Sequence, residues 1–170
     1  SDAGKKYVEN FEQYRSEGKG LLMYGTRGNG KTYVASSIAN ALLDKGYSVL
    51  VTTLTNIEAD LSSCEDKGEY YDSLNSYTLL ILDDFGAERQ TSYMQEITYN
   101  VINNRYVKKL PLILTSNITN EQLRNPESIE QERVYSRLFE MCHPLCSKGD
   151  DLRKIKARAD YIRMKNELGM

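Results

Sequence analysis

Tryptophan is absent from the 170 residues, histidine occurs once, and proline and cysteine occur three times each. Three thiols cannot form a disulfide framework, and so sparse and odd a count is typical of reduced cysteines, which predicts a cytoplasmic protein. Because His143 is the single imidazole, a Ser-His-Asp or Cys-His catalytic centre would depend on this one residue. Cys142 and Cys146 flank it, but no second pair of ligands completes a tetrahedral zinc site.

Long apolar runs are also missing. No stretch approaches the roughly 18 residues that a membrane-spanning helix needs, and no signal peptide is visible at the start. The net charge of -2 argues against a strongly basic body that grips nucleic acid everywhere, although it permits a local basic face. A length of 170 residues predicts a single domain over 1–170. Ser1-Asp2-Ala3 resembles the remnant of an expression tag, and we expect a partner-binding domain upstream.

Apolar runs alternate with helical patterns along the chain, which predicts an α/β fold with a parallel sheet and crossover helices. The expected strands are 20–24, 48–54, 78–82, 110–115 and a weak fifth at 143–146. The expected helices are 32–45, 56–67 with a shorter stretch near Tyr70, 93–107, 129–140 and a charged terminal helix at 151–168.

A complete phosphate-binding motif follows the first expected strand. Residues 25–32, GTRGNGKT, match G-x-x-x-x-G-K-[ST] between a strand and a helix, which is the context that this motif requires. The glycines let backbone N–H groups turn towards a phosphate, and the following helix adds its positive N-terminal end. The motif predicts ATP and Mg²⁺ as ligands, with Lys31 on the β- and γ-phosphates and Thr32 on the magnesium ion. The predicted nucleotide-binding residues here are Gly25, Thr26, Arg27, Gly28, Asn29, Gly30, Lys31, Thr32 and Tyr33.

Two aspartates end the most apolar expected strand, LLILDD. Because ligands of parallel sheets bind at the carboxyl ends of strands, Asp83 is expected beside the phosphate loop as a magnesium-holding acid. Asp84 is expected to orient and polarise the attacking water of a hydrolysis reaction. Glu88 is a lesser candidate for this water-positioning role. The alternative is a pair of solvated turn aspartates ahead of Gly86.

Three further polar positions are candidates for sensing the nucleotide. Asn117 ends the fourth expected strand, where it can hydrogen-bond the attacking water or the γ-phosphate. Its alternative role is to cap the next helix, for which Thr119 competes. Arg153 opens the terminal helix, where a cation opposes the helix dipole, so local helix stability does not explain its placement. From there it can reach the γ-phosphate.

Arg133 and Arg137 lie four residues apart on one face of a predicted helix. An additional arginine stabilises transition-state charge at a magnesium-nucleotide site, and a separate helix is well placed to deliver it to a neighbouring subunit. The alternative is a solvated basic stripe that pairs with Glu130 and Glu132.

These motifs together resemble the AAA+ ATPase domain of bacterial helicase loaders of the DnaC/DnaI type and of the related transposition helper ATPases of the IstB type. The resemblance rests on GLLMYGTRGNGKT, LLILDDFGAE, INNRYVKKLPLILTSN, ERVYSRLFEMC and GDDLR, and it runs from Tyr7 to Arg153. It implies a P-loop NTPase of AAA+ type with a five-stranded parallel sheet and a short or absent lid.

The resemblance also implies roles for single residues. Lys31 and Thr32 resemble Walker-A residues, and Asp83 and Asp84 the Walker-B pair, although the wider class usually has Glu at the second position. The further roles it implies are sensor 1 for Asn117, an arginine finger for Arg133 rather than Arg137, sensor 2 for Arg153, and adenine contact for the segment with Tyr7 and Phe11.

Relatives of this kind load a ring-shaped replicative helicase onto single-stranded DNA and act as oligomers. The resemblance therefore implies a helicase-loader ATPase with a helicase, single-stranded DNA and further copies of itself as partners. The helicase-gripping region of such loaders lies upstream of the ATPase domain. Candidate cations for DNA are Arg105, Lys108, Lys109 and the terminal run Arg153, Lys154, Lys156 and Arg158, with a solvated helix face as the alternative.

Three other functions compete with this one. The nearest is a transposition helper ATPase that acts with a transposase on duplex DNA. A small-molecule kinase would need a substrate lid with arginines near the phosphates. A nucleotide-gated binding module would bind ATP with negligible turnover.

Overall fold

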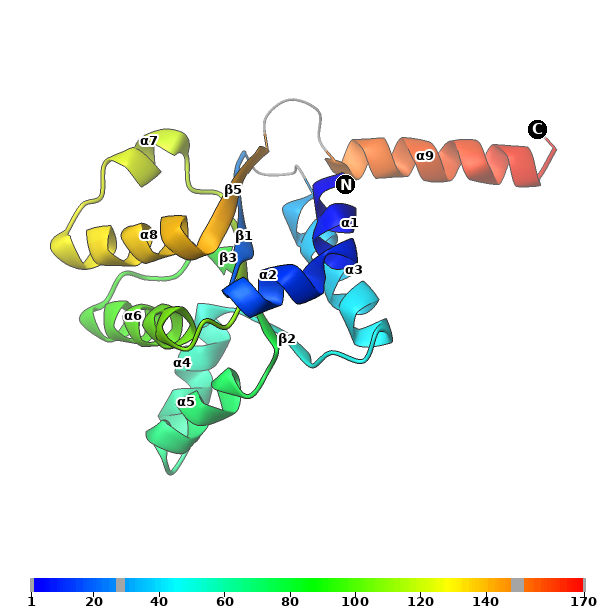
Figure 1. Ribbon diagram of the computed structural model, residues 1–170. Helices are drawn as coiled ribbons and strands as arrows, with labels where there is room; N and C mark the ends of the chain where they lie inside the picture. The colour runs from blue at the N-terminus through cyan, green and yellow to red at the C-terminus, as the bar shows by residue number, and fades with distance from the viewer. Residues whose placement is uncertain (1, 27–29, 148–151, 170) are drawn as a thin grey trace.

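The computed structural model of the chain describes residues 2–26, 30–147 and 152–169, and for residues 152–159 it describes the backbone alone. Within these residues five strands form one sheet in the order β2-β3-β4-β1-β5, and every neighbouring pair is parallel (Figure 1). The strands are β1 (Gly20–Gly25), β2 (Val49–Thr52), β3 (Leu79–Phe85), β4 (Leu112–Ser116) and β5 (Cys142–Ser147). The predicted α/β class and five-stranded parallel sheet are confirmed.

Nine helices lie among the described residues. They are α1 (Asp2–Glu9), α2 (Phe11–Glu17), α3 (Lys31–Asp44), α4 (Leu54–Ser63), α5 (Lys67–Asn75), α6 (Ser92–Val107), α7 (Asn120–Arg124), α8 (Ile129–Met141) and α9 (Leu152–Glu167). Side-chain caps mark several starts, for example Thr53 at α4, Asp66 at α5 and Thr91 at α6. Figure 1 shows α9 extending away from the sheet.

The helices cover the two faces of the sheet in separate layers, as Figure 1 shows. Successive strand residues point to opposite faces, so Leu79 and Ile81 join one buried cluster while Leu80 and Leu82 join the other. The first cluster packs under α1, α2 and α3, and the second under α4, α6 and α8. Both faces of β3 are therefore buried, in keeping with its uninterrupted apolar run.

Helices α1 and α2 precede β1, where no helix is predicted from the sequence. Helices of eight and seven residues gain little stability from their own hydrogen bonds, so their formation depends on tertiary packing. Gly4 lets α1 approach α3, because a Cβ at that position would lie 3.2 Å from Val34 Cγ1. Tyr7 and Phe11 are 3% and 1% exposed, and their rings meet edge to face.

The prediction that Arg105 is a DNA-contacting cation is wrong, because the residue is buried. Its side chain is 0% exposed, and its guanidinium donates to the carbonyl oxygens of Leu74, Tyr77, Thr78 and Pro111 at 2.6–3.4 Å. Burial lowers the pKa of Arg105 to about 10, which leaves it charged at neutral pH. The residue ties the end of α5 and the entrances of β3 and β4 to α6, so it acts inside the fold. Lys108 and Lys109 are exposed.

The order of the strands determines which loops meet. Strand β4 lies between β1, which leads into the phosphate-binding motif, and β3, which ends in the two aspartates. Because all three strands run in the same direction, their carboxyl ends lie at one edge of the sheet. The phosphate loop, the end of β4 and the acidic pair are therefore neighbours at this edge.

Candidate functional site

Lys31 opens α3 directly after the phosphate-binding turn. Gly30 precedes it with φ of 74°, a left-handed conformation that glycine adopts without strain. The Lys31 side chain is 7% exposed, and its Nζ donates to the carbonyl oxygens of Gly25 at 3.2 Å and Thr26 at 2.8 Å. The ammonium group is thus held over the turn in which a phosphate would lie. Arg27, Gly28 and Asn29 lie outside the described residues.

Thr32 and Asp83 meet across two elements. Thr32 Oγ1 donates to Asp83 Oδ1 at 2.9 Å, which joins the first turn of α3 to the end of β3. Mg²⁺ prefers oxygen ligands from a hydroxyl, a carboxylate, water and substrate phosphates. These two oxygens supply the protein's share of that set, so the predicted magnesium ligands fit the ion.

Thr115 links the two aspartates to strand β4. Its hydroxyl donates to Asp83 Oδ1 at 2.5 Å and accepts from the backbone N–H of Asp84 at 3.0 Å. The side chain is 1% exposed, so neither bond competes freely with water. No role for Thr115 is predicted from the sequence, although it stands two residues before Asn117. The one sequence feature that could have indicated this role is a hydroxyl near the end of the fourth expected strand.

Asp84 adopts a backbone conformation that is uncommon for an aspartate. Its φ is 55°, and the register between β3 and β4 shifts between Leu82 and Phe85. Left-handed non-glycine residues persist where the surrounding structure fixes them, and they gather at functional sites. The shift turns Asp84 out of the ladder, and its side chain is exposed at the same edge of the sheet as Lys31 and Thr32.

The loop after Asp84 is also bonded to β4. Ser116 Oγ donates to the carbonyl oxygen of Phe85 at 2.5 Å and accepts from the N–H of Ile118 at 3.1 Å. Gly86 donates its N–H to both carboxylate oxygens of Glu88 at 3.1 Å. Burial raises the pKa of the Glu88 carboxyl, which the nearby N–H groups partly oppose. Glu88 is thus committed to its own loop, and its water-positioning role stays a prediction.

Asn117 is exposed at the end of β4, and its side chain makes no hydrogen bond to the described part of the chain. The alternative, that Asn117 caps the next helix, is wrong. Thr119 caps α7 and forms a capping box with Gln122. The amide of Asn117 is available at the edge where the phosphate loop and the acids meet, and its sensing role stays a prediction.

The two arginines of α8 differ in their surroundings. Arg137 Nε donates to Asn103 Oδ1 at 2.9 Å, and its guanidinium stacks near the rings of Tyr99 and Tyr106 on α6. Arg133 is exposed, and among the described residues its side chain has no hydrogen bond or ion pair. Neither arginine forms the predicted alternative ion pairs with the glutamates of α8 within the described residues. Arg133 is therefore free to contact another molecule. Arg137 could do so only after breaking its contacts with the side chains of α6.

Two other predicted groups have contacts of a different kind. Tyr7 donates its hydroxyl to the carbonyl oxygen of Lys19 at 2.8 Å and stacks on Tyr14, and Phe11 packs against Tyr47. These contacts account for Tyr7 and Phe11 as core residues, and their contact with adenine stays a prediction. Tyr33 is 46% exposed beside the phosphate loop. The backbone of Arg153 lies in α9, but its side chain is outside the described part.

The cysteine-histidine segment forms strand β5. Cys142 is buried, its Sγ donates to the carbonyl oxygen of Leu112 at 3.3 Å, and burial raises the pKa of the thiol. His143 and Cys146 are exposed. Within the described residues, no group of three or more histidines, cysteines or acids could hold a metal ion. In the same residues no helix is long and apolar enough to cross a membrane.

The phosphate-binding turn, the oxygen pair of Thr32 and Asp83 and the parallel sheet define a P-loop domain of AAA+ type. The chain belongs to the family of IstB-like ATP binding proteins, whose model matches residues 3–159. ATP binding is therefore the shared property of this family.

Individual relatives come from replication and from transposition. The chain is 29% identical over 164 residues to the replicative helicase loader DnaI of Bacillus subtilis, covering 87% of this chain and 53% of the relative. It is 28% identical to a putative ATP-binding protein, Rv3427c, in an insertion sequence of Mycobacterium tuberculosis, covering 82% and 57%. The crystal structure of the DnaC helicase loader superimposes with a TM-score of 0.74 at 26% identity, covering 86% of each chain. The chain spans about half the length of these two curated relatives.

Proposed function

We propose that this domain binds ATP with Mg²⁺, hydrolyses it, and uses the nucleotide cycle to help load a replicative helicase onto single-stranded DNA. The observation that carries the proposal is the hydrogen-bonded set of Thr32, Asp83 and Thr115, which joins the phosphate turn to the strand bearing Asn117. When bound, the magnesium ion would neutralise charge on the β- and γ-phosphates. Thr32 and Asp83 are the residues that would hold it, and Lys31 would bind the phosphate oxygens.

Asp84 is the proposed water-orienting acid. Its exposed carboxylate stands one residue beyond the magnesium-holding Asp83, at the edge where a water can approach the γ-phosphate in line. Asn117 is proposed to hydrogen-bond that water or the phosphate. Arg133 is proposed to act on the nucleotide of a neighbouring copy, because an exposed cation whose side chain has no partner among the described residues can reach a site across an interface.

The experiment that tests hydrolysis is the replacement Asp84→Asn, which keeps the size of the side chain and removes its charge. We expect phosphate release to fall at least 100-fold while ATP binding, followed with a fluorescent ATP analogue, stays within about twofold. Asp72→Asn, at an exposed position on α5, is the matched control and should leave turnover unchanged. Unchanged turnover in Asp84→Asn would remove Asp84 from the mechanism and favour a nucleotide-gated binding module.

The likeness to an insertion-sequence protein favours a second candidate, a transposition helper that acts with a transposase on duplex DNA. Binding of the full-length protein to purified replicative helicase and to purified transposase separates the two. We expect ATP-dependent binding to the helicase, together with salt-sensitive binding to single-stranded DNA measured by fluorescence anisotropy. Binding to the transposase alone, with preference for duplex DNA, would replace the loader by the helper.

A further inference from the structure

Tyr24 is the last residue but one of β1, directly before the phosphate-binding turn. The described pairs of the ladder between β1 and β4 end at Met23 and Thr115. One residue further along, the Tyr24 side chain packs against the buried cluster under α4, α6 and α8. Its hydroxyl donates to Asn120 Oδ1 at 2.7 Å, although the two residues are 96 positions apart in the sequence. This hydrogen bond joins the entrance of the phosphate turn to the first residue of α7.

The Tyr24 hydroxyl is the donor of this bond at neutral pH. Partial burial and the nearby Cys146 raise the pKa of the phenol above its ordinary value, so the hydroxyl keeps its proton. Asn120 has an amide oxygen that can only accept, which matches a protonated phenol. Both side chains are half-buried, so water competes with the bond less than it would at a fully exposed position.

Helix α7 depends on contacts outside itself. It has five residues, too few for a helix that is held by its own hydrogen bonds alone. Its capping box lies within its own first turn, and Leu123 is its buried residue. The hydrogen bond from Tyr24 fixes the start of the helix, where the chain arrives from Asn117. The position of the segment from Asn117 to Asn120 is therefore sensitive to the end of β1.

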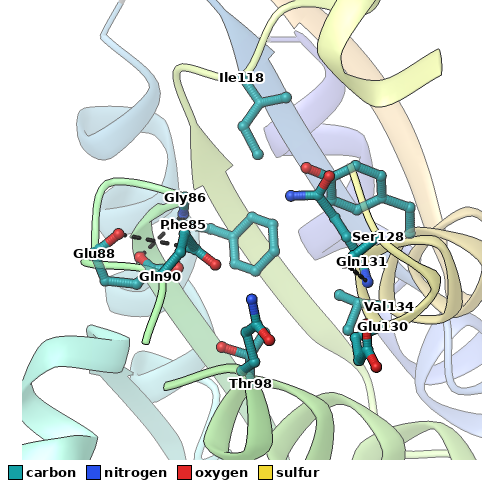
Figure 2. Close-up of a pocket in the computed structure, with 12 residues that line it drawn as sticks. Phe85, Gly86, Glu88, Gln90, Thr98, Ile118, Ser128, Glu130, Gln131 and Val134 are labelled. Carbon is teal, nitrogen blue, oxygen red and sulfur yellow. Dashed lines mark hydrogen bonds between the residues drawn. The ribbon is translucent and has the colours of Figure 1, made fainter. Parts of the chain in front are cut away.

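The same segment also lies against the acidic loop. Figure 2 shows the side chain of Ile118 directed towards Phe85 and Gly86, with which it lines a small cavity. A Cβ at Gly86 would lie only 2.8 Å from Ile118 Cδ1, so the side chain and the loop are in close contact. Asn117 thus stands between two anchors, the acidic loop through Ile118 and β1 through Asn120.

The carbonyl groups that follow Tyr24 are hydrogen-bonded to Lys31. Its Nζ donates to the carbonyl oxygens of Gly25 at 3.2 Å and Thr26 at 2.8 Å. Phosphate oxygens are stronger acceptors for an ammonium group than neutral carbonyls, because both partners are then charged. A bound nucleotide would therefore draw Nζ away from these carbonyls, and Gly25, with φ of 117°, can adjust its backbone without strain. Nucleotide binding thus changes the contacts of the residue next to Tyr24.

We propose that Tyr24 is a positioning residue that couples nucleotide binding to the segment carrying Asn117. A phosphate held by Lys31 resets the end of β1, and the Tyr24 hydroxyl carries this change to Asn120 and so to the first turn of α7. With nucleotide bound, the hydrogen bond holds Asn117 in place relative to the phosphate turn. Tyr24 itself touches no reacting atom. The effect on turnover rests on the proposed function, whereas the coupling to α7 requires only nucleotide binding.

Hydrogen–deuterium exchange of the full chain, with and without magnesium and the non-hydrolysable analogue AMPPNP, tests the coupling. We expect the nucleotide to slow the exchange of the amides of residues 117–124 about fivefold, the value of one neutral hydrogen bond. Tyr24→Phe and Asn120→Ala should remove this protection, whereas Asn120→Asp, which keeps an acceptor oxygen, should retain it. The matched control is Tyr70→Phe, which breaks a similar bond from Tyr70 to Asp60 and should also retain the protection.

ATP turnover gives the second readout. Tyr24→Phe should lower kcat about fivefold and leave the Kd of a fluorescent ATP analogue within about twofold. The double variant Tyr24→Phe/Asn120→Ala should be no slower than the slower single variant, because both substitutions remove the same bond. Tyr70→Phe should leave both constants unchanged, although it should lower Tm about as much as Tyr24→Phe does.

Equal protection of residues 117–124 by the nucleotide in Tyr24→Phe and in the unmodified chain would overturn the proposal, as would its absence in both while the analogue binds. Effects of the two substitutions on kcat that multiply in the double variant would show that the residues act separately, and would overturn the role of the bond. A failed Asp84→Asn test leaves the exchange measurement intact, because exchange does not involve hydrolysis. Failure of the analogue to bind would overturn both proposals.

Discussion

Replacing Thr115 with valine is the sharpest test of how the acidic pair is held. Valine has nearly the shape of threonine, so the buried site is not emptied, but both hydrogen bonds of the hydroxyl are lost. A hydrogen bond to a charged group contributes about 1.5–3 kcal/mol and a neutral one about 1 kcal/mol. Because Asp84 is exposed and its N–H can turn to water, we expect a net loss of about 2–3 kcal/mol in the free energy of unfolding. In a domain of this size, that loss corresponds to about 5–10 °C in Tm.

The assay compares Thr115→Val with Thr115→Ser, which keeps the hydroxyl, in urea denaturation and in ATP turnover. The serine variant should retain most of the turnover, whereas the valine variant should lose it about tenfold or more because Asp83 is no longer oriented. Nucleotide binding in the absence of magnesium should differ little between the two. If the valine variant is as stable and as active as the serine variant, the hydrogen bonds from Thr115 to Asp83 and Asp84 are not needed for stability or turnover. That result would refute the proposed role of Thr115.

Three further predictions follow from the same structure. Arg105→Met should destabilise the fold by about 3–5 kcal/mol, because it leaves several buried carbonyl oxygens without a donor, while Lys108→Met at an exposed position should change thermal denaturation little. Arg133→Ala should preserve ATP binding and lower turnover, and activity should return when it is mixed with a subunit that cannot bind ATP, whereas an effect only in Arg137→Ala would identify Arg137 as the trans-acting group. Gly86→Ala should cost roughly 1–2 kcal/mol in urea denaturation, because φ is 91° and the new Cβ would lie 2.8 Å from a side-chain methyl group; a neutral effect would contradict this geometry.

The parts of the site that lie close together in sequence were predictable. The phosphate motif is a contiguous sequence pattern, and so is an apolar strand that ends in two aspartates. The sequence alone therefore predicts that Lys31, Thr32 and Asp83 lie at one edge of the sheet, as the structure shows. Thr115 is not predicted in this way, because its role depends on β4 lying between β1 and β3. Strand order follows from packing across the whole chain, and neither composition nor periodicity records it.

The burial of a single polar residue is equally hard to predict from the sequence. Arg105 reads as one more cation in a basic segment, but the structure places it among carbonyl oxygens that only tertiary contacts bring together. The helices before β1 are not predicted for a related reason, because α1 packs against α3 and Phe11 of α2 packs against Tyr47, residues far from them in the sequence. In each case a non-local contact overrides a local pattern.

The acidic loop and the end of β4 are bonded to each other at three consecutive positions. Asp83 and Asp84 both bond to Thr115, and Phe85 bonds to Ser116. Because Asp84 is held at positive φ by these contacts, the loop cannot shift along the sheet without breaking charge-assisted or buried hydrogen bonds. A change at the phosphate loop that moves Asp83 must therefore also displace the strand end that carries Asn117. In the proposed cycle, loss of the γ-phosphate would be transmitted through these side chains to α7 and α8, the elements that present Arg133 to a neighbouring copy.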